Sequence, residues 1–145
     1  MTEQNDLLKL DHQLCFALYS THLALNQVYR KLLTPLGLTY PQYLVMLILW
    51  ETNPQTVSTI GRRLFLESST LTPMLKRLEK MELLSRQRSE QDERQVLIAL
   101  TDKGQQLKQQ AEKIPELIRD HSQCDLQSLS ELKHQLDALR AKLIK

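Results

Sequence analysis

The stretch that decides the fold is "TVSTIGRRLFLESSTLTPMLKRLEKMELL", residues 56–84. It holds two apolar patterns of helical spacing, separated by a short connection. Because Thr and Ser are favoured helix N-caps, Thr56 should cap a first short helix, and Ser68 or Ser69 a second one. Pro73 should then lie in or near the first turn of the second helix, since a proline deeper in a helix removes a hydrogen bond. Two short helices with a tight connection are the helix-turn-helix pattern.

The second helix should bury one side and expose another. The side expected in the core carries Leu71, Leu75, Leu78 and Met81. Near the N-terminal half, the residues expected to be exposed are hydrogen-bonding types, namely Ser68, Ser69, Thr70, Thr72, Lys76 and Arg77. A recognition helix contacts base edges and phosphates of DNA with such residues.

The residues that follow change from a helical period to an alternating one. "LLSRQR" (83–88) and "RQVLIALT" (94–101) flank the polar "SEQDE" (89–93). This pattern predicts two antiparallel strands with a charged tip. The two helices and the hairpin together predict a winged helix-turn-helix in a mainly α (α+β) fold. An arginine at the tip of such a wing, here Arg94, can enter the minor groove, where the negative potential is strongest.

Helices are also expected before this unit. Leucines recur at helical spacing over residues 6–34, which predicts one long amphipathic helix that ends at Pro35. "LTYPQYLVMLILWE" (38–51) is apolar nearly all round, which predicts a buried central helix that Pro54 ends.

Two further helices are expected after the hairpin. Thr101 should cap a helix that runs to about residue 114, where Pro115 interrupts it, and residues 125–143 should form the last helix with a stripe of leucines. The winged unit already fills the small core, so the first and last helices lack a partner for their leucines. The sequence therefore predicts that these helices pack across the two-fold axis of a homodimer.

Composition sets broad limits. The chain has 145 residues, 41% of them hydrophobic, and a net charge of +2, which fits one domain and is only weakly suggestive of nucleic-acid binding. The N-terminus lacks a basic, apolar leader, and no apolar stretch approaches the ~20 residues of a membrane span. We therefore expect a cytoplasmic protein with no membrane partner.

One of the two cysteines, Cys15, lies on a polar line along the first helix. At about 100° per residue, Tyr19, His22, Asn26 and Tyr29 fall within about 40° of Cys15, and the leucine stripe runs beside them. Phenol donors favour a thiolate, the form that a peroxide oxidises to sulfenic acid. Cysteine is also among the most often buried residues. The residues alone leave both interpretations open: a reactive thiol or a core side chain.

The sequence contains no motif for a metal site, a phosphate-binding loop or a catalytic nucleophile. The four histidines lack metal-ligand spacing, and neither cysteine is in a C-x-x-C pair. A Gly-rich phosphate loop and a nucleophile elbow are also absent from the sequence. We therefore expect no metal, no cofactor and no enzymatic activity.

Three segments together resemble a known family. "LDHQLCFALYS" (10–20), "LTYPQYLVMLILWE" (38–51) and "STLTPMLKRLEKMELLSRQRSEQDERQVLIALTDKG" (69–104) resemble the MarR family of winged-helix repressors, specifically its organic hydroperoxide sensors of the OhrR type. The resemblance covers residues 7–145. It implies a single MarR-type domain over residues 1–145, with dimerisation helices at about 1–35 and 105–145 and the DNA-binding unit at about 36–104.

The resemblance also implies roles for individual residues. Cys15 would be the peroxide sensor, hydrogen-bonded by Tyr29 and Tyr40 and with Tyr19 close by, and some of these tyrosines would come from the other subunit. Cys124 would resolve oxidised Cys15 as an intersubunit disulfide; in the other version of this branch a small thiol does so. The residues that the resemblance implies at DNA are Ser68, Ser69, Thr70, Pro73, Arg77, Asp92 and Arg94, with Asp92 orienting the arginine. Thr72, Lys76 and Arg86 complete the predicted DNA-binding set.

The function that follows is redox control of transcription in the response to oxidative stress. The reduced homodimer would bind a pseudo-palindromic operator in double-stranded DNA. Oxidation of Cys15 by an organic hydroperoxide would release it and derepress a peroxide-detoxifying gene. Two alternatives are a MarR-type repressor released by reversible binding of a small aromatic ligand, and a thiol peroxidase.

Overall fold

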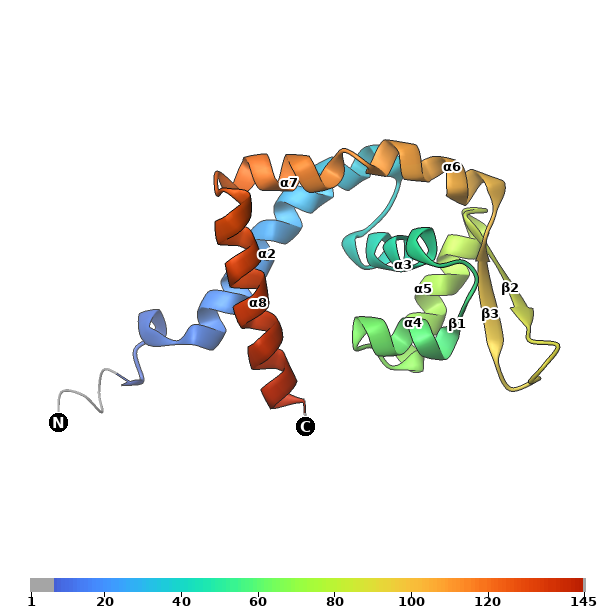
Figure 1. Cartoon of the computed structure of the whole chain (residues 1–145), viewed down its shortest axis with the longest axis horizontal. Coiled ribbons are helices and arrows are strands. Elements are labelled where there is room, and N and C mark those ends of the chain that lie inside the picture. Colours follow the sequence, from blue (N-terminus) through green and yellow to red (C-terminus); the bar gives the residue numbers. More distant parts are fainter. Residues whose placement is uncertain (1–6, 145) are drawn as a thin grey trace. The chain divides into compact units, whose positions relative to one another are not determined.

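The computed structural model describes residues 7–144. The chain divides into two compact units, residues 1–111 and 112–145, and each unit is described by itself. The first unit contains the helix-turn-helix and the small sheet, and the second contains two helices (Figure 1).

The first long helix, α2, spans Leu14–Leu33 and is preceded by the short 3-10 helix η1, Leu10–His12. The expectation of one continuous helix from residue 6 is therefore wrong at its start, and residue 6 itself lies outside the described residues. The break has a local cause. In a continuous helix the backbone N–H of Gln13 would donate to the Lys9 carbonyl, but here the Gln13 side-chain amide donates to it at 3.0 Å. The Gln13 backbone N–H donates to Leu10 instead.

The central helix, α3, spans Tyr40–Glu51, as predicted, and follows the 3-10 helix η2, Thr34–Leu36. Thr39 and Gln42 form a reciprocal capping box at its start, with bonds of 3.0 and 3.4 Å. The core residues on this helix are Tyr43, Val45, Met46, Ile48 and Leu49.

The predicted helix-turn-helix is present as α4, Val57–Leu64, and α5, Ser68–Lys80. The Thr56 hydroxyl accepts from the Thr59 backbone N–H at 3.1 Å, which confirms the first cap. The second cap prediction is wrong, because Ser68 is already helical and the N-cap is Glu67, which makes no side-chain capping bond.

Pro73 also lies deeper in α5 than predicted, beyond its first turn. The proline removes one backbone hydrogen bond of the helix. Burial of one face offsets that loss, since the core residues of α5 are almost completely buried: Leu71, Leu75 and Leu78.

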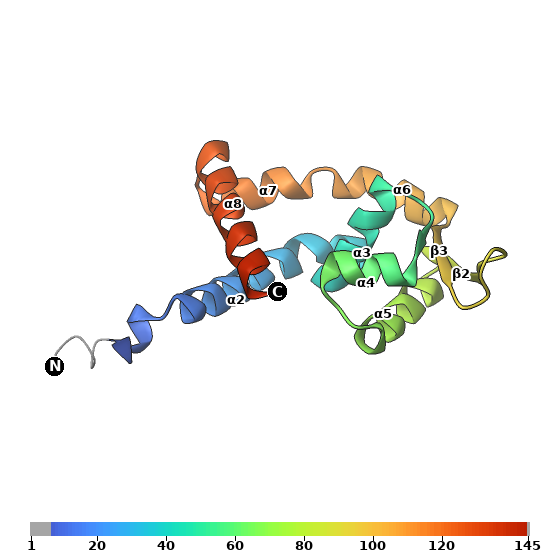
Figure 2. The same ribbon diagram turned by 60° about the horizontal axis from the view of Figure 1, so that its bottom comes forward.

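The predicted hairpin is formed by β2, Leu84–Arg88, and β3, Val96–Leu100, with Arg86 opposite Ile98. A third strand, β1, Gln55–Thr56, pairs with the other edge of β3, so the sheet order is β1-β3-β2. The sequence did not predict β1, because two residues are too few to show an alternating pattern. Figure 2 shows the hairpin extending from the unit that holds α4 and α5.

The first unit closes with α6, Asp102–Ala111. The Thr101 hydroxyl accepts from the Gly104 N–H at 3.0 Å, as the predicted cap requires. The Gly104 carbonyl in turn accepts from the Trp50 indole N–H at 2.9 Å, which ties α6 to α3. A Cβ atom at Gly104 would lie 2.0 Å from the Leu83 carbonyl oxygen, so only glycine fits this close approach.

The second unit consists of α7, Ile114–Ser122, and α8, Leu126–Leu143. Pro115 lies in the first turn of α7, which fits the predicted interruption, although α6 already ends at Ala111. The leucine stripe of α8 is open in the single chain, and its most exposed members are Leu126, Leu132 and Leu143.

Membrane-spanning potential is limited to one bent pair of helices. Among residues 7–144 no single helix is long and apolar enough to cross a bilayer. Only the segments Leu14–Leu36 and Tyr40–Glu51 meet the length and composition criteria together, and they are bent by 65°.

Candidate functional site

Cys15 lies in the first turn of α2, and its side chain is exposed. Tyr19, one turn later, is 62% exposed. The thiol therefore does not fill the core of its own chain, and it is open to a reagent or to a second copy of the protein.

The polar line predicted along α2 is present. The Asn26 side-chain amide lies 3.2 Å from Nε2 of His22, so these two residues share one face of the helix. The His22 ring meets the Tyr40 ring edge-on, with centroids 6.4 Å apart. The line therefore leads from the exposed Cys15 toward α3.

Three tyrosines cluster where the C-terminal half of α2 packs on α3. The ring centroids of Tyr29 and Tyr40 are 4.5 Å apart, and Tyr43 lies 5.9 Å from Tyr29 and 6.4 Å from Tyr40. Sequence reasoning singled out Tyr29 and Tyr40 but missed Tyr43. Its spacing, three residues after Tyr40 on an apolar helix, was the available signal.

Burial keeps these phenols protonated. Burial, together with the smaller effects of the neighbouring Tyr40 and Tyr43, raises the pKa of Tyr29 to about 12. Burial also raises the pKa of Tyr40 and of Tyr43. At neutral pH the cluster therefore presents hydroxyl groups that can donate hydrogen bonds to an anion.

The chain does not bring its own Cys15 to this cluster. Cys15 and Tyr29 are both on α2, and at 1.5 Å per residue they lie about 21 Å apart along the axis. A phenol cannot span that distance. Of the predicted thiol partners, only Tyr19 is near Cys15 within one chain.

A groove of about 500 Å³ opens beside Tyr40, between the end of α2 and the start of α3. Its lining combines apolar, amide and cationic groups: Asn26, Arg30, Thr34, Gly37, Leu38, Thr39, Tyr40 and Pro41. Such a mixture suits a small molecule with an apolar body and a polar or acidic group.

Cys124 lies between α7 and α8 in the second unit, and its thiol is free and exposed. The Cys124 backbone N–H donates to the Ser122 hydroxyl at 3.1 Å, and the thiol contacts the Ser122 carbonyl at 3.4 Å. An exposed thiol at a helix junction is accessible to another cysteine.

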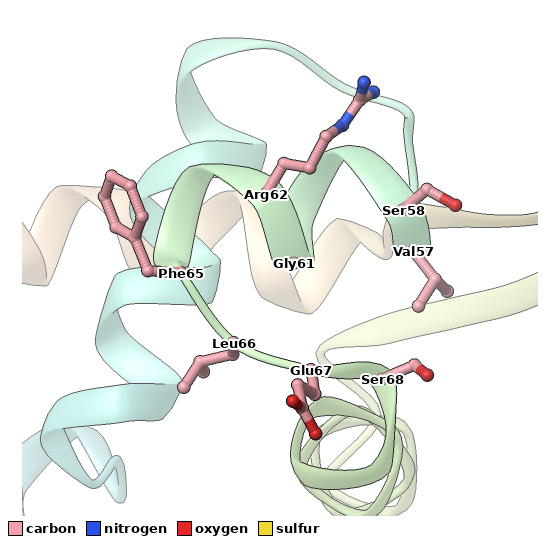
Figure 3. Close-up of a pocket in the computed structure, with 8 residues that line it drawn as sticks. All are labelled: Val57, Ser58, Gly61, Arg62, Phe65, Leu66, Glu67 and Ser68. Atoms are coloured by element: carbon pink, nitrogen blue, oxygen red, sulfur yellow. The ribbon is translucent and has the colours of Figure 1, made fainter. Parts of the chain in front are cut away.

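The residues predicted to read DNA lie along α5 as expected. The exposed ones are Ser68, Ser69, Thr70, Pro73, Lys76 and Arg77, and Thr72 is half-buried. A hollow of about 420 Å³ separates α4 from the start of α5 (Figure 3). Ser58 and Arg62 line it together with Ser68, and sequence reasoning singled out neither of them.

The wing tip is a defined turn. The Asp92 carboxylate accepts from the Arg94 backbone N–H at 3.0 Å, and an Arg88 guanidinium N–H donates to the Glu93 carbonyl at 3.2 Å. Asp92 therefore orders the backbone that carries Arg94. Arg86 lies lower in the wing, where its Nε is buried without a hydrogen-bond partner in the structure.

A metal site finds no support in the part of the chain that the structure describes. Within residues 7–144, no group of three His, Cys, Asp or Glu side chains could hold a metal ion.

Comparison with known proteins gives consistent results. Residues 27–111 match the family model described as transcriptional regulator SarA/Rot. The chain is 47% identical to the organic hydroperoxide resistance transcriptional regulator of Bacillus subtilis (strain 168), over 96% of this chain and 95% of that one.

Solved structures of similar proteins include several of AbfR, from Staphylococcus epidermidis. A structure of reduced AbfR bound to DNA has a TM-score of 0.76 and 40% identity, and covers 98% of this chain and 99% of that chain. A structure of disulfide-formed AbfR has a TM-score of 0.63 and 43% identity, and covers 95% of this chain and 97% of that chain.

Proposed function

This chain belongs to the MarR family of winged-helix transcriptional regulators, and on that premise we propose that it is a cytoplasmic, homodimeric repressor controlled by the redox state of Cys15. The reduced dimer binds operator DNA. An organic hydroperoxide oxidises Cys15 and releases the DNA, which derepresses a peroxide-detoxifying gene. The similar proteins are transcriptional regulators, so they lend no support to the alternative of a thiol peroxidase.

DNA binding rests on α5 and the wing. The exposed hydroxyl, Lys and Arg side chains of α5 suit the major groove, and Arg94 at an ordered wing tip suits the minor groove. Two such units related by a two-fold axis match a pseudo-palindromic operator, with half-sites about one helical turn of DNA apart. That reduced AbfR has been solved with DNA supports this part of the proposal.

Dimer formation rests on the open apolar faces. On α2, Leu14 is 60% exposed, and on α8, Leu126 and Leu132 are 66% and 53% exposed. Exposed apolar helix faces of this kind mark interfaces. A second copy of the chain covers them most simply, because most soluble homo-oligomers are two-fold dimers.

The sensor is then completed by the second copy. Because Cys15 lies about 21 Å from Tyr29 of its own chain, the phenols that hold its thiolate are those of the partner. Protonated Tyr29 and Tyr40 donate hydrogen bonds to the thiolate and favour that charged form. The single observation that carries the proposal is this exposed thiol together with a pair of protonated phenols placed out of its reach in the same chain.

Oxidation of Cys15 proceeds in two steps. The Cys15 thiolate attacks the terminal oxygen of the hydroperoxide, so an S–O bond forms, the O–O bond breaks, and the alkoxide leaves and takes a proton from water to become the alcohol. The product is the sulfenic acid. The Cys124 thiol of the partner then attacks that sulfur, an S–S bond forms, and water leaves. The first step removes the thiolate that the tyrosines bind, and the second replaces the sulfenic acid with a disulfide, so the arrangement of the two DNA-binding units shifts.

Operator binding tests the proposal. Wild-type protein should bind operator DNA when reduced and release it after treatment with cumene hydroperoxide, whereas Cys15→Ser should bind and stay bound. Cys124→Ser is the matched control, because it keeps the first oxidation step and loses only the covalent dimer on a non-reducing gel. Release of Cys15→Ser by the hydroperoxide would overturn the sensor assignment.

The groove beside Tyr40 favours a second candidate function, a repressor released by reversible binding of a small aromatic ligand. NadR, 26% identical with a TM-score of 0.68, has been solved in complex with 4-hydroxyphenylacetate. This alternative predicts that a phenolic acid releases the DNA from wild type and Cys15→Ser equally. It also predicts that Arg30→Ala weakens that response.

A further inference from the structure

We propose that Ser89 is a positioning residue for DNA binding, because its hydroxyl group holds the tip of the wing in the shape that aims Arg94 at the minor groove. This inference rests on the proposed function, since it takes Arg94 as the residue that enters the groove. It deepens that function by giving a role to a side chain that lies outside the predicted DNA-binding set.

Ser89 is a buried residue in an exposed loop. The tip of the wing, residues 89–95, joins β2 to β3, and six of its seven residues are exposed. Ser89 itself is 9% exposed. Serine lies mostly at protein surfaces, and buried hydroxyl groups have hydrogen-bond partners. The burial of Ser89 therefore indicates that its hydroxyl group is used inside the loop.

The Ser89 hydroxyl oxygen accepts two backbone hydrogen bonds from within the turn. The Gln91 N–H donates to it at 3.2 Å and the Asp92 N–H at 3.4 Å. A hydroxyl oxygen has two lone pairs, so it can accept both bonds at once. One small side chain therefore fixes the backbone at two successive positions of the tip.

A chain of hydrogen bonds leads from Ser89 to Arg94. Asp92, whose N–H donates to Ser89, accepts from the Arg94 N–H with its carboxylate at 3.0 Å. The Asp92 carbonyl accepts from the Gln95 N–H at 2.9 Å, and the Gln95 carbonyl accepts from the Ser89 N–H at 2.8 Å. Ser89 is therefore connected to the residues on both sides of Arg94.

The residue types of the tip do not fix this turn through the backbone alone. Residues 89–95, all of which the structure describes, contain neither glycine nor proline, and none of them has a positive φ angle. Tight turns commonly rely on those two residue types or on side chains that bond to the nearby backbone. The shape of this tip therefore depends on the side-chain bonds of Ser89 and Asp92.

The aim of the tip matters because it carries charges of both signs. Glu90, Asp92 and Glu93 are exposed on the same tip as Arg94. The phosphates of DNA attract the guanidinium group and repel the carboxylates. A tip without its fixed turn brings carboxylates as well as Arg94 to the groove. Loss of the neutral Ser89 hydroxyl should therefore weaken DNA binding although no charge changes.

Operator binding by single and double variants, measured by fluorescence anisotropy, tests this role. Reduced Ser89→Ala should bind about three- to tenfold more weakly than wild type, which corresponds to about one hydrogen bond. Gln91→Ala is the matched control and should bind within about twofold of wild type, because it removes an exposed side chain of the same tip and keeps the N–H that donates to Ser89. In an Arg94→Ala background, Ser89→Ala should weaken binding by less than about twofold, since a residue that acts through Arg94 then has nothing to position.

Ser89→Ala that binds as tightly as wild type would overturn the inference. An equal loss in the wild-type and Arg94→Ala backgrounds would also overturn it, because Ser89 would then support the wing as a whole and not the aim of Arg94. Failure of the proposed DNA contact has a different signature, since Arg94→Ala itself would then bind as tightly as wild type. A loss in Ser89→Ala that disappears when Arg94 is absent is the result that the proposal predicts.

Discussion

Replacing Gly104 with alanine should destabilise the protein at the junction of α3, α6 and the hairpin. A Cβ atom at this position would lie 2.0 Å from the Leu83 carbonyl oxygen and 3.2 Å from the Leu100 side chain. The first contact is with a backbone atom, which cannot rotate away. Helix α6 must therefore move away from Leu83 by about 1 Å or more to restore an ordinary contact distance.

The size of the effect follows from what that movement disrupts. Overpacking a tight contact costs about 1–3 kcal/mol. The shift also weakens two hydrogen bonds of Gly104, its N–H to Thr101 at 3.0 Å and its carbonyl from Trp50 at 2.9 Å, each worth about 1 kcal/mol. Alanine gains about 1 kcal/mol over glycine in a helix. The net loss in the free energy of unfolding is therefore about 3 kcal/mol.

Urea unfolding measures this loss, and Trp50, the single tryptophan of the chain, reports on it by fluorescence. Both proteins are compared at one concentration, because dimer stability depends on it. Gln105→Ala, the next residue on the exposed side of α6, is the matched control and should change stability by less than about 0.5 kcal/mol. A Gly104→Ala protein as stable as wild type would refute the argument from close packing.

Three further predictions follow from the same structure. Titration of phenolate absorbance should find Tyr29 ionising near pH 12, and a midpoint near pH 10 would contradict its burial. Because folding favours the protonated form, the contribution of Tyr29 to the free energy of unfolding is complete below about pH 10, the ordinary pKa of tyrosine, and is lost as the pH rises through 12. Thr56→Ala removes the bond to the Thr59 N–H and should cost about 1 kcal/mol in urea unfolding, with an unchanged midpoint as the contrary result. Arg94→Ala should weaken operator binding by about 1–3 kcal/mol in a fluorescence anisotropy assay, while Glu93→Ala at the same tip should not, and equal effects would remove the special role of Arg94.

Much of the fold could be predicted because its signals are local. The apolar run from Tyr43 to Trp50 determines α3, and the alternation in residues 94–101 determines β3. Thr56 and Thr101 supply the hydroxyl groups that cap α4 and α6. In each case the residues that carry the signal are the residues that make the structure.

The predictions of element boundaries were wrong where a distant or atypical contact determines where a helix or strand begins. The start of α2 moved to Leu14 because the Gln13 side chain replaces a backbone hydrogen bond. The start of α5 could not be predicted from a capping side chain, since Glu67 provides none, and tertiary burial offsets the loss at Pro73. Strand β1 exists only because β3 offers it an edge.

The candidate site shows the same division. Helical geometry placed Cys15 and Tyr29 on one line, and the exposed Cys15 is consistent with that placement. Tyr43 joins the cluster through the packing of α2 on α3, and its spacing from Tyr40 is the only local signal for it. The separation of Cys15 from Tyr29 follows from the length of α2. A contact between the two residues therefore requires a second copy of the chain.

A mixed-dimer experiment tests the central claim most directly, that a hydroperoxide releases DNA through a Cys15 site completed by the other subunit. Heterodimers of a Cys15→Ser chain with a Tyr29→Phe/Tyr40→Phe chain hold one Cys15, which faces the intact tyrosines of its partner. Heterodimers of wild type with a Cys15→Ser/Tyr29→Phe/Tyr40→Phe chain also hold one Cys15, but it faces only phenylalanines. The account predicts that cumene hydroperoxide oxidises Cys15 and releases operator DNA faster in the first heterodimer. Faster release from the second would show that Cys15 depends on the tyrosines of its own chain and would contradict the account.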